Sequence, residues 1–289
     1  IRRPPRSTPL YSSAASDVYK RQVFKEIDVG DRPIAVTLSP GEEYGYVANH
    51  FDDSISVISI ADAAVIQTIS LGPGRQLTPA EKGEKLFYDA KLSLDGWYSC
   101  HSCHPDGHTH GQLNDNLGDD TYGTPKRVPT LLGTSNTGPW GWIGNRTTLW
   151  EQVEKSIETT MRGKKPEAPV VEALVAYLEL FDTAPPGSVE QNRAAVKRGS
   201  DVFERLKCGK CHRPPAYTTA GSYDVGLADE AGQDSYNPPS LRGLPHRDRF
   251  LHDNRARSLS RALELHRPAA MKDLPDTARS DLLSFLLSL

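Results

Sequence analysis

The sequence lacks the long apolar runs and basic clusters that mark membrane and nucleic-acid-binding proteins. No stretch approaches the roughly 20 apolar residues that a membrane-spanning helix needs. Its 34 lysine and arginine residues are outnumbered by 37 aspartate and glutamate residues, and the net charge is −3. We therefore expect no nucleic-acid partner and no transmembrane segment. The 289 residues suffice for about two domains and a short additional piece.

Cysteine is also scarce, and its placement is informative. All four cysteines lie in two copies of the pattern C-x-x-C-H, so none is left for a disulfide. This pattern is the attachment signature of c-type haem. Two thiols on one helical turn reach the two vinyl groups of one haem, and the following histidine binds its iron. We expect two covalent haems, one held by Cys100, Cys103 and His104 and the other by Cys208, Cys211 and His212.

A structural zinc site is the competing interpretation of two C-x-x-C pairs. It gives the two histidines that follow the pairs no role, so we favour haem. Covalent haem attachment implies export, and we expect a periplasmic or cell-surface protein. No signal peptide is visible at the start of the sequence.

Residues 1–22 are basic, rich in proline and serine, and without apolar periodicity. This composition predicts disorder. The stretch also resembles translated adaptor sequence more than native protein, so it is left out of the fold prediction. We expect the natural chain to continue upstream.

Residues 23–75 contain five short β-rich runs separated by glycine, proline and aspartate turns. The pattern of residues 27–30 returns at 69–72, a period of 42 that suits a four-stranded propeller blade. Tyr46–Asn49 resembles the namesake run of YVTN-type β-propeller repeats. We expect about one blade of an all-β partial propeller. An ordinary antiparallel meander is the alternative.

From residue 76 the pattern becomes helical and occurs twice. Each copy has a predicted capping box and a Gly-x-x-x-Phe pair just ahead of C-x-x-C-H, as in the N-terminal helix of class I cytochromes c. The boxes are Thr78–Glu81 and Ser188–Gln191, and the pairs are Gly83/Phe87 and Gly199/Phe203.

An internal duplication explains these two copies. The cysteine pairs share an offset of 108 with Leu174, Tyr177 and Leu178, which match Leu282, Phe285 and Leu286. Five further matches share an offset of 110: Pro129, Leu131, Gly133, Leu149 and Met161 with Pro239, Leu241, Gly243, Leu259 and Met271. We expect a mainly α fold with two tandem class I cytochrome c domains, 76–183 and 184–289.

Residues 76–289 resemble the bacterial di-haem cytochrome c peroxidase family, which includes the enzyme that matures methylamine dehydrogenase. The resemblance rests on Cys100–Gly107, Pro129–Leu132, Trp142–Gly144 with Leu149 and Gln152, Pro239–Arg242 and Phe250–Asp253. It implies electron transfer and peroxide reduction, with electrons from a small redox protein or a quinol-linked donor. Propeller-to-di-haem fusions are a known arrangement in such proteins.

The resemblance also implies roles for single residues. Trp142 matches the tryptophan that relays electrons between the haems, although it is also compatible with a core aromatic. Trp140 is assigned to packing. Gln152 and His252 are expected to support the haem surroundings without binding iron.

The sixth iron ligands follow partly from the resemblance and partly from the repeat. His266 lies fourteen residues after His252, where the family places the second haem's sixth ligand; Met271 competes with it. For the first haem, Met161 is a candidate by repeat symmetry, and an open site is the alternative. His108 and His110 are expected in a solvated loop, and no histidine matches the family's distal position, within 117–120.

Two departures weaken the peroxidase assignment. Arg162 stands where the family's peroxidases carry a glutamate that moves protons. Arg127 replaces an asparagine beside a Ca²⁺ site, so we expect no Ca²⁺. Carboxylates at 151, 154 and 158 are equally compatible with a solvated helix face. The catalytic residue therefore stays unknown, and a pure electron carrier or a surface binding propeller with relaying haems competes with the peroxidase.

Overall fold

The computed structural model describes residues 25–74, 76–186, 192–266 and 268–289. It contains two compact units, residues 1–76 and residues 77–289. The expected leader 1–22 and the expected capping box Ser188–Gln191 lie outside the described residues. Among the described helices, none is both long and apolar enough to span a bilayer.

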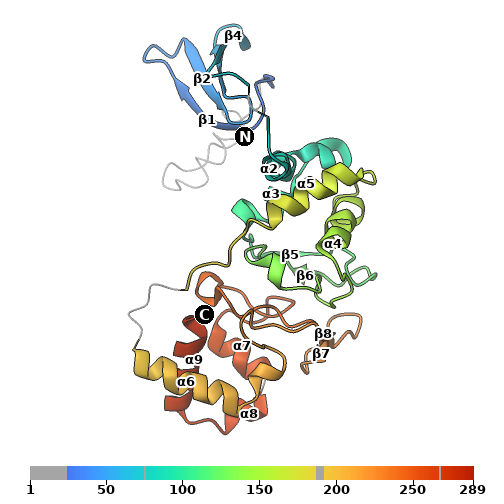
Figure 1. The fold of residues 1–289 in the computed structure, drawn as a ribbon, viewed down its shortest axis with the longest axis vertical. Helices are drawn as coiled ribbons and strands as arrows, with labels where there is room; N and C mark the ends of the chain where they lie inside the picture. Colours follow the sequence, from blue (N-terminus) through green and yellow to red (C-terminus); the bar gives the residue numbers. More distant parts are fainter. Residues whose placement is uncertain (1–24, 75, 187–191, 267) are drawn as a thin grey trace, which may run out of the picture. The chain divides into compact units, whose positions relative to one another are not determined.

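The first unit is a four-stranded antiparallel sheet in which each strand pairs with its sequence neighbour (Figure 1). The inner strands β2 and β3 consist mostly of buried and partly buried residues, whereas the edge strands leave apolar side chains exposed, Val36 at 71%. A single blade and an ordinary meander both have this order, so the propeller stays a prediction. The strands are β1 Pro33–Leu38, β2 Tyr44–Asn49, β3 Ser54–Ser59 and β4 Ala64–Ser70.

The first of the five expected β runs, residues 23–30, is not a strand where the structure describes it. The chain beside it turns onto the end of β2 instead. The backbone N–H of Asp31 donates to Asp52 Oδ2 at 2.6 Å, and the carbonyl oxygen of Asp31 accepts from Phe51. Because these bonds hold the chain at Asp31 against the β2–β3 turn, the preceding residues do not pair with the sheet as a strand.

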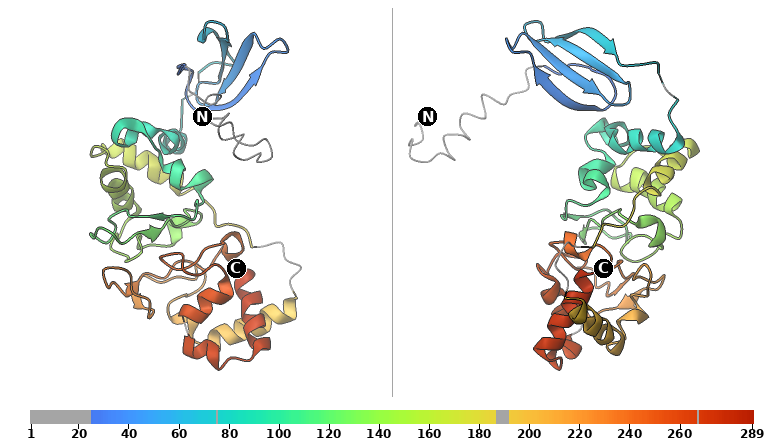
Figure 2. Two further views of the ribbon diagram at one scale, coloured as in Figure 1. Left: turned by 180° about the vertical axis from the view of Figure 1, so that it is seen from behind. Right: turned by 60° about the vertical axis from the view of Figure 1, so that its left-hand side comes forward.

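The second unit is mainly helical and carries two short β-hairpins, β5–β6 and β7–β8. In each half, the first and last helices pack against one another, α2 on α5 and α6 on α9 (Figures 1 and 2). The helices are α2 Pro79–Tyr88, α3 Cys100–Cys103, α4 Leu149–Lys155, α5 Ala168–Leu178, α6 Arg193–Arg205, α7 Leu259–His266, α8 Pro268–Lys272 and α9 Asp276–Leu287. The short strands are β5 Leu113–Asn114, β6 Lys126–Arg127, β7 Tyr223–Asp224 and β8 Ser235–Tyr236.

Glycine is required where these helix pairs cross. A Cβ added to Gly83 would collide with the carbonyl oxygen of Ala173 on α5, and one added to Gly199 would collide with that of Asp281 on α9. The two glycines of the predicted Gly-x-x-x-Phe pairs therefore set how closely the helices approach.

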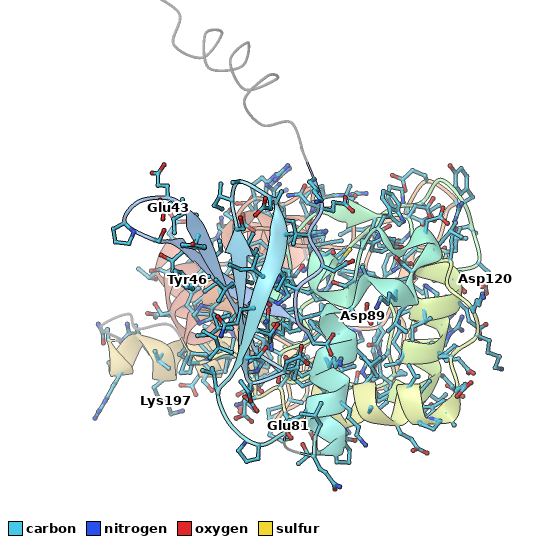
Figure 3. The ribbon with its side chains drawn as sticks, turned by 90° about the horizontal axis from the view of Figure 1, so that it is seen from above. Glu43, Tyr46, Glu81, Asp89, Asp120 and Lys197 are labelled. Atoms are coloured by element: carbon cyan, nitrogen blue, oxygen red, sulfur yellow. The ribbon has the colours of Figure 1, made fainter. Side chains whose placement is uncertain are left out.

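The helix starts follow local hydrogen bonding. The predicted capping box of α2 is present: Thr78 Oγ1 accepts from the N–H of Glu81, and Glu81 Oε2 accepts from the N–H of Thr78 at 2.8 Å. Figure 3 labels Glu81 in the first turn of α2 and Asp89 at its end. In α6 the N-cap is Asn192, whose side chain accepts from Ala194 and Ala195.

The expected duplication is visible in the local structure. Matching features recur at the offset of 110, and each half has its own buried core, around Phe87 and Met161 in the first and Phe203 and Met271 in the second. The matching features are the 3₁₀ turns Thr134–Asn136 and Leu244–His246, the bridges Trp140–Arg146 and Phe250–Ala256, and left-handed Gly133 and Gly243. The assignment of each half to the class I cytochromes c, and the boundary at 183, stay predictions.

Candidate functional site

Each C-x-x-C-H motif forms one tight helical turn. The first is α3, and the second begins as a 3₁₀ turn at Cys208–Lys210. In both, the N–H of the histidine donates to the carbonyl oxygen of the first cysteine at 2.9 Å. The turn therefore presents two thiols, neither in a disulfide, and the histidine within one short segment, as thioether attachment to one haem requires.

The two motif histidines have the protonation that an iron ligand needs. His104 Nδ1 lies 3.3 Å from the carbonyl oxygen of His108, and His212 Nδ1 lies 3.1 Å from that of Tyr217. Because a carbonyl oxygen only accepts, Nδ1 carries the proton and Nε2 keeps its lone pair for a metal. Burial lowers the pKa of both imidazoles to about 4, which keeps them neutral.

A cavity in the first half adjoins this motif. It is lined by both thiols, His104, Met161 and apolar side chains of the first core, including Phe87 and Leu174. Met161 is buried, with 4% exposed, in the core formed by α2, α4 and α5. Thiols and a neutral imidazole at one wall, with aliphatic walls around them, form a donor set that fits haem c.

In the second half, the structure brings the His212 and His266 rings close together in an edge-to-face arrangement. Their ring centres are 6.4 Å apart, and the ring planes are 73° from parallel. Two imidazoles that bind one metal ion from opposite sides have ring centres roughly 6 Å apart, because each metal–nitrogen bond is about 2 Å. The competing residue, Met271, is buried in the second core, with 3% exposed. The spacing thus fits the predicted pair of ligands.

The other histidines of the first motif region are engaged elsewhere. His108 Nδ1 lies 2.7 Å from Thr130 Oγ1, and its Nε2 lies 3.2 Å from the carbonyl oxygen of His246 in the other half. His108 therefore bridges the two halves and does not simply face solvent. His110 Nδ1 accepts from the N–H of Gln112.

Of the three carboxylates near the expected catalytic position, Glu151 and Glu154 are engaged elsewhere, and Glu158 is exposed. Glu151 Oε2 accepts hydrogen bonds from Thr147 and Thr148 at the start of α4, and these bonds lower its pKa. Glu154 pairs with Lys165 at 3.2 Å. Arg162 is exposed on the surface.

Trp142 lies where the two halves meet. Its indole Nε1 donates to the carbonyl oxygen of Arg127 at 2.8 Å, and the Arg127 guanidinium lies 5.3 Å from the ring centre. Its own carbonyl oxygen accepts from the N–H of Asn237, in the second half, at 2.8 Å. Trp142 also lines the first cavity. Trp140 lines the same cavity and donates to Thr134 Oγ1.

Two aromatic neighbours extend the site from Trp142 into the second half. The rings of His252 and Tyr236 each lie 6.3 Å from Trp142, and they stack on each other at 4.3 Å. His252 is buried, with 2% exposed, and burial lowers its pKa. Gln152, the other expected supporting residue, lines the cavity and donates to Ser156.

The sequence prediction missed a buried charge cluster that joins the halves. Lys126 Nζ lies 2.9 Å from Asp119 Oδ2 in the first half and 2.9 Å from Asp229 Oδ2 in the second, the latter an ion pair rather than an aligned hydrogen bond. All three side chains are at most 10% exposed. The offset of 110 aligns Lys126 and Arg127 with Tyr236 and Asn237 at the same interface, but it does not link Lys126 to Asp229.

In the part of the chain that the structure describes, no three His, Cys, Asp or Glu side chains gather to hold a metal ion. The two cysteine pairs are thus not joined in one site, as the zinc interpretation would require.

Known proteins share this architecture. Residues 79–205 match the family model described as di-haem cytochrome c peroxidase. The methylamine utilization protein MauG of Methylophilus methylotrophus is 24% identical, and the match covers 74% of this chain and 82% of that protein. Cytochrome c551 peroxidase of Nitrosomonas europaea is 26% identical, over 66% of this chain and 75% of that protein.

Solved structures are similar in fold. A chain of hydrazine synthase from Kuenenia stuttgartiensis has a TM-score of 0.63 at 23% identity, covering 78% of this chain and 99% of that one. The diheme peroxidase BthA from Burkholderia thailandensis has a TM-score of 0.54 at 16% identity, covering 89% and 95%. Residues 79–205 thus resemble the di-haem cytochrome c peroxidase family, and the curated relatives include a cytochrome c peroxidase.

Proposed function

We propose that this protein is a di-haem c-type cytochrome of the peroxidase family that passes electrons between two covalently bound haems. The observation that carries the proposal is the 6.4 Å approach of His212 and His266 across one C-x-x-C-H site, whose local structure is repeated at the first motif. Cys100 and Cys103 would hold the first haem beside His104. Cys208 and Cys211 would hold the second between His212 and His266.

Haem supplies reversible one-electron chemistry at iron when it is bound. The protein's own residues orient and connect the two sites. His104 and His212 are fixed by their Nδ1 hydrogen bonds, and the Trp142 indole is fixed by its bond to the Arg127 carbonyl oxygen. Trp142 thus places a π system where the halves meet, as an electron relay would.

The proposed substrate is a peroxide. Reduction of hydrogen peroxide to two molecules of water consumes two protons from solvent and two electrons, and the electrons are drawn one at a time from a small redox protein or a quinol-linked donor. We expect slow turnover because Arg162 stands where the family carries its glutamate and two of the three nearby carboxylates are engaged elsewhere: Glu151 caps α4, and Glu154 is paired with Lys165. Electron transfer is therefore the main activity that we propose.

The remaining parts of the proposal concern location and the N-terminal sheet. Covalent haem attachment implies export, so we propose a periplasmic or cell-surface location. The four-stranded sheet would be one blade of a YVTN-type propeller, and the exposed apolar side chains of its edge strands, Ile34 at 59% and Ile66 at 54%, are compatible with adjoining blades. A role as a surface binding module is not supported by the relatives, which are redox proteins.

The test is haem content and ligation together. The full chain, expressed with cytochrome maturation factors, should bind two haems by pyridine haemochrome assay, and the double variant Cys208→Ala/Cys211→Ala should bind one. Electron paramagnetic resonance should then show one low-spin iron signal lost in that variant. Bound zinc without haem would reject the proposal.

A further inference from the structure

The first cavity is strongly cationic. Among the described residues, its lining includes five lysine and arginine side chains but a single carboxylate, Asp119. Asp119 is already bound to Lys126, which in turn faces Asp229. Unpaired charges in a low-dielectric site are costly, so this excess of positive charge indicates an anionic ligand. The five cations are Lys126, Arg127, Arg146, Lys155 and Arg247.

Arg127 contributes from the first half. Its side chain is buried, with 5% exposed, and its Nε donates to the carbonyl oxygen of Leu251 at 3.2 Å. In the described part of the chain, no carboxylate lies within ion-pair distance of it. Asp248 stabilises its charge, but the Asp248 side chain is 84% exposed and lies 3.8 Å from Arg249.

Arg247 contributes from the second half and lines the same cavity. Its Nη2 donates to the carbonyl oxygen of Arg242 at 2.9 Å, while its buried Nε has no hydrogen-bond partner among the residues that the structure describes. Burial lowers the pKa of Arg247 to about 9, and the nearby positive charge of Arg127 adds to that shift. The positive charges of Arg127 and Arg247 therefore line one cavity from opposite halves. Arg247 Nε remains available there as a hydrogen-bond donor.

We infer that Arg127 and Arg247 form a two-residue clamp for the propionate carboxylates of the first haem. This inference rests on the proposed function, because it requires haem in the cavity beside Cys100, Cys103 and His104. Haem c carries two carboxylates, and the guanidinium group binds a carboxylate through two parallel N–H donors. Two guanidinium groups match two carboxylates in charge and number.

The clamp also explains why its members come from different halves. Arg127 and Arg247 are far apart in sequence, yet both line the cavity of the first motif. A ligand held by both would tie the second half to the first haem. Trp142, under the Arg127 guanidinium, would then be fixed at the junction by the same contacts.

The experiment measures the first haem's reduction potential in Arg127→Met and Arg247→Met. Each substitution removes a positive charge beside the propionates, so reduction becomes less favourable and the potential of the first haem should fall. The propionate bending band in the resonance Raman spectrum should also shift. Arg127→Lys and Arg247→Lys keep the charge but lose the paired donors, so they should shift the Raman band with a smaller change in potential. If a Met variant fails to fold, the Lys variant at the same position still tests the inference.

The matched control is Arg193→Met, which removes the same charge from an exposed position at the start of α6. It should leave both readouts unchanged. The arginine substitutions are then repeated in Cys208→Ala/Cys211→Ala, which lacks the second haem, and the shifts in potential and Raman band should persist. If the shifts disappear, the clamp belongs to the second haem and the inference is overturned. Unchanged potential and Raman band in the Arg127 and Arg247 variants, with two haems bound, would also overturn it.

Haem content is measured first in every variant, so the two proposals fail separately. Absence of haem from the native chain rejects the proposed function. Two bound haems with no response to the arginine substitutions reject only the clamp, and a response that depends on added phosphate shows a free anion in the cavity and rejects it as well.

Discussion

Trp142 and His252 occupy equivalent positions of the two halves, related by the offset of 110, and each accepts the same interface hydrogen bond. The carbonyl oxygen of Trp142 accepts from the N–H of Asn237, and that of His252 accepts from the N–H of Arg127, which is itself the equivalent of Asn237. The halves thus meet through a local two-fold relationship, as in a symmetric dimer. One copy of the position carries an indole, and the other carries an imidazole, with the rings 6.3 Å apart.

This placement makes Trp142 the first residue to test. Trp142→Phe keeps an aromatic ring but loses the indole and its 2.8 Å bond to the Arg127 carbonyl oxygen. We expect slower electron transfer between the haems, with both haem spectra intact, in flash or stopped-flow experiments. Trp140→Phe is the control, because Trp140 lines the same cavity and loses a similar bond, to Thr134. Equal rates in both variants and the native protein would reduce Trp142 to a packing role.

The buried cluster of Lys126, Asp119 and Asp229 predicts a large effect on stability. Lys126→Met leaves two carboxylates buried without their cation, which costs about 3–5 kcal/mol of unfolding free energy. Chemical denaturation of the holoprotein measures it. Lys197→Met is the control, since the Lys197–Asp201 pair on α6 is exposed, 75% and 59%, and such pairs contribute at most about 1 kcal/mol. Lys197 is labelled in Figure 3. Equal losses in the two variants would contradict this interpretation.

The same cluster predicts a dependence on pH. Burial alone would raise the pKa of Asp119 and Asp229, but the contact with Lys126 and the hydrogen bonds from neighbouring groups outweigh it and lower both pKa values. Their stabilising contribution is therefore present above the ordinary aspartate pKa of about 4 and is lost as the pH falls further. Burial would lower the pKa of Lys126, but the two carboxylates raise it, so its contribution persists below about pH 10. The difference in stability between native protein and Lys126→Met should shrink below about pH 4. A constant difference across the acidic range up to neutral pH would argue against the cluster.

Because the helices cross closely at Gly83 and Gly199, even the substitution of alanine at either position should lower the stability of the protein. Alanine is normally favoured over glycine in a helix by about 0.5–1 kcal/mol. At Gly83 the added Cβ meets the Ala173 carbonyl oxygen, so Gly83→Ala should instead destabilise the protein by about 1–3 kcal/mol. Gly199→Ala should do the same at α9. Gly72→Ala, where nothing in the described chain lies within 4 Å, should change thermal stability little.

Features set by local sequence were predictable. Residues within a few positions of each other define the two haem motifs, the capping box at Thr78 and the Gly-x-x-x-Phe pairs. The offset of 110 then related the pattern of the first half to that of the second. Gly83 and Gly199 were found because their pattern repeats ahead of each motif. Their packing against α5 and α9 follows from the structure alone.

Features set by contacts between the halves were not predictable. Asp229 is far from Lys126 in the sequence and lies in a loop, so no spacing rule links them. The run at 23–30 had strand composition, yet the neighbouring backbone bonds to Asp52 instead. His108 looked like a loop residue because its partner, the His246 carbonyl oxygen, is 138 residues away.

The sharpest prediction concerns His266. It faces His212 at 6.4 Å, so the second haem should have two imidazole ligands, a low-spin iron and no near-infrared band of the kind that methionine ligation to Fe(III) produces. Because a methionine ligand raises the potential of a haem, His266→Met should raise the potential of the second haem and create that band. Spectroelectrochemistry with near-infrared absorption measures both changes.

His266→Ala and Met271→Leu together separate the two candidate ligands. Met271 lies in the second core with 3% exposed, and leucine replaces its volume at a cost below about 1.5 kcal/mol. If His266 is the ligand, His266→Ala should give a high-spin or water-ligated iron, whereas Met271→Leu should leave the low-spin signal unchanged. A low-spin signal that survives His266→Ala but is lost in Met271→Leu would assign the ligand to Met271. The two imidazoles would then be a packing arrangement, and the second haem would have the higher potential that methionine ligation gives.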